Sequence, residues 1–167
     1  MLPKLPRLES FDYVGSYRYF LTFCTAHREP AFCRAEAVQL VLTQILRAAK
    51  EHGFEIIAYC FMPDHVHLLV QGAGSNSEMK RFAKVAKQYA GFHYKQQNGK
   101  PLWQPSYYEH VLRNDEDTWS VARYIVDNPL RAGLAERADE YPFLGSCVVE
   151  KSDLLFFVSS ATPWRRP

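Results

Sequence analysis

The hydrophobic positions of the chain fall into two kinds of segment, short apolar runs typical of strands and longer runs with helical spacing. Residues 16–25 are rich in aromatic and β-branched side chains, which predicts a strand. Residues 54–72 contain two short apolar segments separated by Pro63-Asp64, which predicts an antiparallel hairpin. A similar run at 106–113 predicts a fourth strand.

Three segments have the pattern of helices. Val38, Val41, Leu42, Ile45 and Leu46 recur at helical spacing within residues 35–51, and a glycine at position 53 ends this helix. A second helix is expected over residues 76–97. An acidic, capped start at residues 114–117 predicts a third helix that reaches Asn128, where the following proline ends it.

The order strand, helix, strand, strand, helix, strand is that of the ferredoxin-like split βαβ unit. We therefore expect an α+β protein with an antiparallel sheet, helices on one face and the third helix appended. Residues 16–145 would form this domain, with an N-terminal arm over residues 1–15 and a C-terminal tail over residues 146–167. The apolar segment at 153–158 has no assigned position in this scheme.

Composition places the chain among ordinary globular proteins. Its 167 residues are 47% hydrophobic and 23% charged, and 20 Lys and Arg against 18 Asp and Glu give a net charge of +2. These values exclude general disorder, and no apolar run approaches the roughly 18 residues that cross a bilayer. We expect a soluble cytoplasmic protein without a membrane partner. The four scattered cysteines are expected to be buried thiols.

His65 and His67 are two positions apart on a predicted strand, so both imidazoles project from the same face. Two ring nitrogens held side by side form half of a metal site. One core histidine and one surface histidine would fit the same spacing equally well.

Tyr124 and Asn128 are four positions apart on the third predicted helix and share a face. The core-facing stripe of this helix is expected to comprise three other residues: Trp119, Ala122 and Val126. Tyr124 would lie nearly opposite that stripe, although Val121 and Ile125 leave open a helix buried on two sides. Taken alone, the pair also fits an ordinary interface tyrosine followed by an asparagine cap.

Positive charge is concentrated on the second predicted helix. Residues 78–100 contain six Lys and Arg against one acidic residue, which is 6 − 1 = +5 in a chain whose total is +2. A cationic ridge interleaved with aromatic rings suits single-stranded nucleic acid, although a solvated helix face has the same pattern. The candidate DNA-binding residues are Lys80, Arg81, Lys84, Lys87, Lys95 and Arg113.

Together, the histidine pair, the tyrosine and the basic ridge describe one reaction. A divalent cation held by the histidines would polarise a phosphodiester while the tyrosyl oxygen attacks phosphorus. The product would be a protein-DNA ester, from which the strand can be passed to another DNA hydroxyl without ATP.

Five segments of the chain resemble the single-tyrosine HUH transposases of insertion sequences. Among these, the chain looks most like the REP-associated tyrosine transposases, which are linked to repetitive extragenic palindromes in bacterial genomes. The resemblance covers roughly residues 15–145. The segments are Tyr19–Phe23, Met62–Leu69, Leu102–Gln104, Tyr107–Val111 and Tyr124–Gly133.

The resemblance implies that His65 and His67 are metal ligands, that Tyr124 is the nucleophile and that Asn128 completes a site for Mg²⁺ or Mn²⁺. It also implies cleavage of single-stranded DNA beside a hairpin formed by a REP-like palindrome. The products would be a 5′-phosphotyrosine and a free 3′-hydroxyl. The sheet would carry the histidines on a central strand.

Other interpretations stay open. A protein that binds hairpin DNA without cleaving it would keep the basic ridge, but it would not need the two histidines, the tyrosine and the asparagine. A histidine-triad hydrolase would need a further histidine where Leu69 stands. The resemblance is compatible with a monomer or a homodimer, and with a tyrosine that serves its own subunit or the partner.

Overall fold

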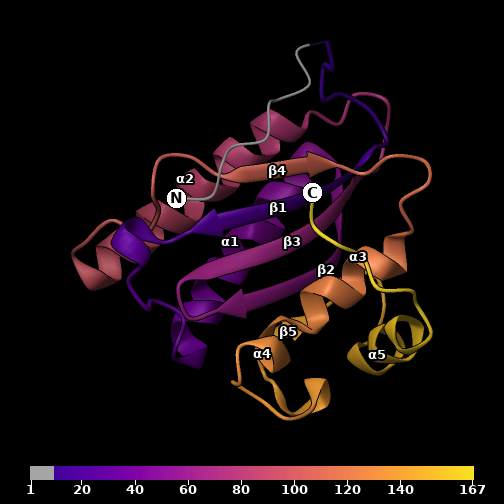
Figure 1. The fold of residues 1–167 in the computed structure, drawn as a ribbon. Coiled ribbons are helices and arrows are strands. Elements are labelled where there is room, and N and C mark those ends of the chain that lie inside the picture. Colours follow the sequence, from indigo (N-terminus) through magenta and orange to yellow (C-terminus); the bar gives the residue numbers. More distant parts are fainter. Residues whose placement is uncertain (1–9) are drawn as a thin grey trace.

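A five-stranded sheet forms the centre of the computed structural model, which describes residues 10–167 (Figure 1). Its strand order is β4-β1-β3-β2-β5, and every neighbouring pair is antiparallel. The predicted arm lies partly outside the described residues. The strands are β1 (Arg18–Cys24), β2 (Phe54–Met62), β3 (His65–Gly72), β4 (Tyr108–Val111) and β5 (Leu144–Gly145).

The predicted hairpin is confirmed and places β3 at the centre of the sheet. His67 pairs with Thr22 of β1 on one side and with Cys60 of β2 on the other. Both histidines begin β3, directly after the turn at Pro63 and Asp64. Because both neighbours are hydrogen-bonded strands, the backbone that carries the histidines is held from both sides.

Two long helices cover one face of the sheet, α1 (Ala35–His52) and α2 (Met79–Asn98). They pack on each other and on alternate residues of β1, β2 and β3, which form the larger hydrophobic core. Gly53 ends α1 in the left-handed conformation at φ 66°, as expected for a glycine cap. Helix α2 begins three residues later than predicted, because Glu78 still forms a bridge with Val14.

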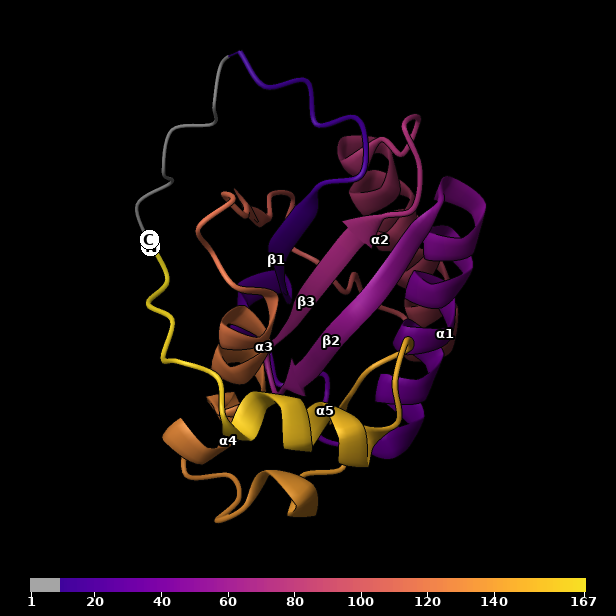
Figure 2. The same cartoon turned by 90° about the vertical axis from the view of Figure 1, so that its right-hand side faces the viewer.

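The opposite face carries α3 (Thr118–Val126), α4 (Asn128–Arg131) and α5 (Lys151–Ser159), as Figure 2 shows. These helices and the second side of β1, β2 and β3 enclose a smaller core. Two short 3₁₀ turns complete the fold, η1 (Ala26–Arg28) and η2 (Ala138–Glu140). The ferredoxin-like arrangement with an appended tyrosine-bearing helix is confirmed.

Helix α3 starts as the sequence predicts and ends earlier. Asp117 caps it by accepting a hydrogen bond from the Ser120 backbone amide at 2.8 Å. The prediction that α3 reaches Asn128 is wrong, because Asp127 separates it from the new helix α4. Pro129 lies in the first turn of α4, where a missing amide hydrogen costs nothing.

Two sides of α3 are buried, as the sequence left open on account of Val121 and Ile125. Val121 and Ile125 are fully buried together with Ala122 and Val126, whereas Trp119 is only half-buried. The second buried side exists because α5 packs along α3. The C-terminal segment therefore contains a helix that the sequence pattern did not reveal.

The expectation of four buried cysteines is wrong. Only Cys60 is buried, whereas Cys24 is half-buried and both Cys33 and Cys147 are exposed; all four are free thiols. No helix among residues 10–167 combines the length and the apolar character needed to cross a membrane.

Candidate active site on the α3 face of the sheet

The two histidines of β3 turn the same ring nitrogen toward each other. His65 Nε2 lies 3.1 Å from His67 Nε2. The other nitrogen of each ring is held from behind, His65 Nδ1 by Asp64 Oδ1 at 2.7 Å and His67 Nδ1 by Thr22 Oγ1 at 2.8 Å. The two Nε2 atoms are thus left facing each other, within hydrogen-bond distance.

Burial keeps both imidazoles neutral. It lowers the pKa of His65, against the opposing effect of its hydrogen bond to Asp64. It lowers the pKa of His67, only 3% exposed, still further, and the positive charges of Arg166, Arg131 and Arg28 add to the effect. Neutral imidazole is the form that binds metal ions.

The histidine pair fits a divalent cation. Two cis ligands of an octahedral ion with bonds of about 2.1 Å stand about 3.0 Å apart, close to the separation of the two Nε2 atoms. Among the described residues no group of three or more His, Cys, Asp and Glu side chains could hold a metal ion. Any further protein ligand must therefore be of another kind, such as an amide oxygen.

Tyr124 approaches the His67 ring from α3. Its ring centroid is 6.2 Å from that of His67 and 5.7 Å from that of Phe20, which supports the ring edge to face. The side chain is half-buried. The structure thus brings the predicted nucleophile and the predicted ligands together within one chain.

Asn128 lies one turn beyond Tyr124, at the start of α4. Its Nδ2 donates to the Tyr124 carbonyl at 3.1 Å. Arg131 Nη2 donates to the same oxygen at 2.7 Å. No side-chain hydrogen bond in the described part of the chain joins Asn128 to either histidine. Because Nδ2 is engaged with the Tyr124 carbonyl, the amide oxygen is the side-chain atom left to bind a cation.

Two arginines near Tyr124, Arg131 and Arg166, were not among the site residues predicted from the sequence. The Arg131 guanidinium lies 4.4 Å from the centre of the Tyr124 ring, and Arg166 lies 3.7 Å from that of Tyr108. Spacing could have indicated Arg131, because seven positions are about two turns of the continuous helix that the sequence predicted. No local pattern could have indicated Arg166, because the last residues reach the site only through the folded chain.

The C-terminal segment packs beside the tyrosine. Trp164 contacts Tyr124 edge to face at 5.2 Å and Phe20 at 5.5 Å. Trp164 Nε1 donates to Glu116 Oε1 at 2.8 Å, and Glu116 also accepts from His110 Nε2 at 2.9 Å. This network fastens the end of the chain to the loop between β4 and α3.

The predicted basic residues of α2 lie on the other face of the sheet from the histidines. Four of them are exposed: Lys80, Arg81, Lys84 and Lys95. The Lys80 ammonium lies 4.4 Å from the Tyr13 ring centre. Arg113 is exposed in the loop after β4. A single DNA molecule that contacts both this ridge and Tyr124 must pass around an edge of the sheet.

Lys87 has a different surrounding from the rest of the ridge. Its ammonium donates to the carbonyls of Gln104, Pro105 and Ser106 at 2.8, 3.2 and 3.1 Å. Burial lowers its pKa to about 8, so it stays protonated at neutral pH. The structure therefore shows Lys87 as the anchor of the loop before β4, where the sequence indicated only a charge on the ridge.

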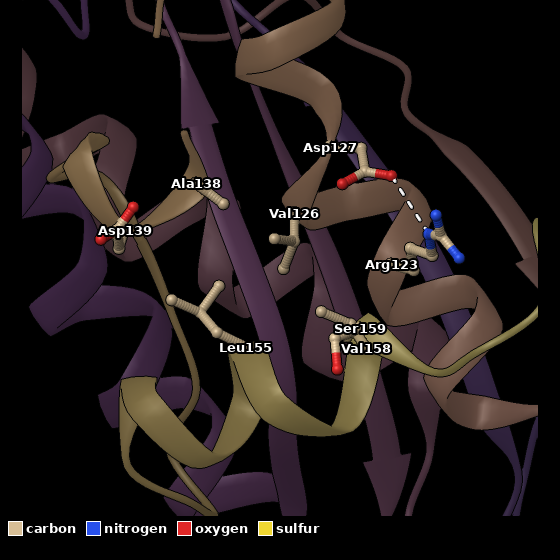
Figure 3. Close-up of a pocket in the computed structure, with 8 residues that line it drawn as sticks. All are labelled: Arg123, Val126, Asp127, Ala138, Asp139, Leu155, Val158 and Ser159. Carbon is tan, nitrogen blue, oxygen red and sulfur yellow. Dashed lines mark ion pairs between the residues drawn. The ribbon is translucent and has the colours of Figure 1, made fainter. Parts of the chain in front are cut away.

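A pocket of about 390 Å³ lies between α3, η2 and α5 (Figure 3). Val126 and Leu155 supply apolar walls, and an ion pair between Arg123 and Asp127 at 3.5 Å lies on one side. Neither histidine nor Tyr124 lines it. It is a separate feature from the histidine site.

Comparisons with known proteins show which proteins this chain resembles. The family model described as "Transposase IS200 like" matches residues 13–128. The chain is 25% identical over 135 residues to a REP-associated tyrosine transposase of Escherichia coli K12, covering 78% of this chain and 77% of the relative. It also resembles a solved REP-associated tyrosine transposase bound to a REP hairpin, with a TM-score of 0.69, 22% identity, and coverage of 84% of this chain and 82% of that one.

Proposed function

Because the chain belongs to the IS200-like transposase family, we propose that it is a metal-dependent endonuclease and strand transferase for single-stranded DNA, with Tyr124 as the nucleophile. The observation that carries the proposal is the position of the Tyr124 ring, 6.2 Å from the ring of His67, whose Nε2 faces that of His65. A structural tyrosine would not need a pair of neutral imidazoles beside it with their Nε2 atoms facing each other.

The proposed step forms one bond and breaks another. The Tyr124 oxygen loses its proton and attacks the phosphorus of a phosphodiester, and the bond from phosphorus to the 3′ oxygen breaks. The departing oxygen takes up a proton and becomes a 3′-hydroxyl, while the 5′-phosphate stays on the tyrosine. Attack by another 3′-hydroxyl reverses the sequence and joins the strand to a new partner.

His65, His67 and the amide oxygen of Asn128 would hold Mg²⁺ or Mn²⁺. When bound, the cation would offset the negative charge that develops on the phosphate oxygens. The chain itself contributes rigid ligands, because Asp64 and Thr22 each hold one imidazole from behind.

The chain also contributes positive charge beside the nucleophile. Arg131 lies over the phenol ring and Arg166 over Tyr108, so a phosphate that approaches Tyr124 meets two guanidinium groups. Both residues follow the catalytic elements in the chain, and they reach the site through α4 and the C-terminal segment.

The proposed DNA partner is a single strand with a hairpin formed by a REP-like palindrome. The exposed lysine and arginine side chains of α2, together with Arg113, would bind the phosphates of this DNA in a salt-dependent way. A similar fold has been solved with a REP hairpin. With a DNA partner of this kind, the protein would act in the cytoplasm.

We further propose that each chain supplies both halves of its own site. Tyr124 and the histidines meet within one chain, so neither a monomer nor a homodimer has to exchange α3 between subunits. The histidine-triad alternative would need a histidine at position 69, where Leu69 packs in the smaller core.

A denaturing gel tests the proposed function. The protein is incubated with labelled single-stranded hairpin DNA and Mg²⁺ or Mn²⁺, then denatured in detergent. We expect the label on the protein, and we expect Tyr124→Phe and His65→Ala to abolish this adduct while hairpin binding persists. Binding without any adduct from the unaltered protein would favour the silent hairpin-binding alternative, and an undiminished adduct from Tyr124→Phe would exclude that residue as the nucleophile.

A further inference from the structure

The turn after β1 reaches across to the residue that orients His65. Arg28 Nε is 2.8 Å from Asp64 Oδ2, while the other carboxylate oxygen, Oδ1, holds His65 Nδ1. Arg28 Nη1 also donates to Cys24 Sγ at 2.8 Å. A continuous chain of contacts therefore runs from Cys24 through Arg28 and Asp64 to His65.

The backbone of this turn is strained. His27 and Arg28 are consecutive non-glycine residues with positive φ, 54° and 58°. Such conformations persist only where the surrounding structure fixes them, and they are frequent at functional sites. Here Thr25 does so: its amide donates to the Asp64 carbonyl at 3.0 Å, and its hydroxyl lies within hydrogen-bond distance of the Glu29 carbonyl at 2.7 Å and of the Asp64 carbonyl at 3.0 Å.

The two histidines differ in whether the partner of Nδ1 decides which ring nitrogen carries the hydrogen. An ionised carboxylate only accepts hydrogen bonds, so Asp64 requires a hydrogen on His65 Nδ1 and leaves Nε2 with its lone pair. The Thr22 hydroxyl can donate or accept, so it leaves both forms open to His67. The Asp64 carboxylate is thus the group that commits one imidazole to act as a ligand.

We propose that Arg28 is a positioning residue of the cation site, which holds the Asp64 carboxylate in the orientation that keeps His65 Nε2 directed at the cation. The proposal rests on the proposed function, because it concerns the cation that His65 and His67 would bind. Arg28 itself touches neither DNA nor the reacting atoms in this account. Its contribution passes through Asp64.

If Arg28 acted only through its charge, replacing it would strengthen cation binding, not weaken it. Arg28 carries a positive charge near the histidines, and removing a positive charge strengthens the binding of a cation. Loss of the orienting contact weakens it instead, because outer partners of metal-bound histidines typically contribute about 10-fold to 100-fold in affinity. The direction of the change therefore separates the two roles.

The test measures Mn²⁺ binding to the full chain by titration calorimetry and by the electron paramagnetic resonance signal of free Mn²⁺. We expect Arg28→Gln to weaken binding about tenfold. Arg28→Lys keeps the positive charge, but its single ammonium lacks the fork with which arginine bonds Asp64 and Cys24 together. The Mn²⁺ affinity of this variant should therefore fall between those of the unaltered protein and Arg28→Gln. Unchanged or tighter Mn²⁺ binding by Arg28→Gln would overturn the proposal.

A matched control is Arg47→Gln. Arg28 and Arg47 each expose 53% of the side chain and each form an ion pair, but Arg47 pairs with Glu51 on α1, away from the histidines. This variant should bind Mn²⁺ as the unaltered protein does. Thermal unfolding in metal-free buffer would show that both variants are folded.

A second readout needs no metal. Long-range ¹H–¹⁵N spectra of the histidine rings report which nitrogen carries the hydrogen, and we expect Arg28→Gln to reduce the Nδ1–H form of His65. An unaltered protein that binds no Mn²⁺ and forms no adduct would refute the proposed function together with this inference. Normal binding by the unaltered protein and by Arg28→Gln would refute the role of Arg28 alone.

Discussion

The phenol ring of Tyr124 lies 6.2 Å from the imidazole ring of His67, and both belong to the same chain. The tyrosine comes from α3, and the histidine from the central strand of the sheet. Their contact depends on α3 packing back onto the sheet, where Val121 and Ile125 are fully buried. The two halves of the candidate site are therefore held together by the smaller core.

This relationship predicts the result of a mixing experiment. If each chain uses its own tyrosine, a mixture of Tyr124→Phe and His65→Ala should form no more DNA adduct than either variant alone. The denaturing gel described above measures it, after the two variants have been unfolded and refolded together so that any subunits can exchange. Recovery of adduct in the mixture would show that the tyrosine serves a partner subunit.

Arg131 is expected to support the chemistry. Its guanidinium lies 4.4 Å from the Tyr124 ring centre and can meet the attacked phosphate. We expect Arg131→Gln to slow single-turnover adduct formation by about tenfold or more, since charge would develop there without a preorganised donor. Arg137→Gln is the control, because that exposed arginine pairs with Asp139. Equal rates for both variants would contradict a role for Arg131.

Lys84 is expected to contribute to DNA affinity through charge alone. Its side chain is exposed on α2, on the far face of the sheet from Tyr124. Lys84→Ala should weaken hairpin binding and make the dependence of log affinity on log salt shallower by about 0.7 to 0.9. Fluorescence anisotropy at several salt concentrations measures the slope. An unchanged slope would remove Lys84 from the DNA contacts.

Lys87, on the same helix, is expected to affect stability. Lys87→Met leaves three loop carbonyls without their donor, so the free energy of unfolding should fall by about 1–3 kcal/mol. Urea unfolding measures this change. Lys84→Met, which breaks no such contact, is the control and should differ little from the unaltered protein. A stable Lys87→Met protein with weakened DNA binding would instead favour the role first predicted from the sequence.

The cysteines are expected to react unequally. Burial raises the pKa of the Cys60 thiol to about 12, whereas Cys33 is exposed. Because the thiolate is the reactive form, a disulfide reagent at pH 8 should modify Cys33 and leave Cys60 intact until the protein unfolds. Mass spectrometry of peptides identifies the modified residue. Rapid modification of Cys60 in the folded protein would contradict its buried position.

Several features of the site could be predicted because they depend on short spacings. His65 and His67 share a face since side chains alternate along a strand, and Tyr124 and Asn128 are neighbours since a helix turns once in 3.6 residues. Lys87 shows the limit of this reasoning. Periodicity places it with Lys80 and Lys84, but a loop distant in sequence approaches its ammonium and changes its role.

The sequence by itself determined β1 to β4, the two long helices, the histidine pair and the tyrosine, because each is written in local periodicity or in a short motif, whereas the two-residue β5 was not predicted. The tertiary structure alone decided which groups surround them. Arg28, Arg166 and Trp164 come from segments far apart in the chain and meet near Tyr124 and His65 only after the two faces of the sheet are covered. Such contacts arise from the packing of whole elements, which no local pattern encodes.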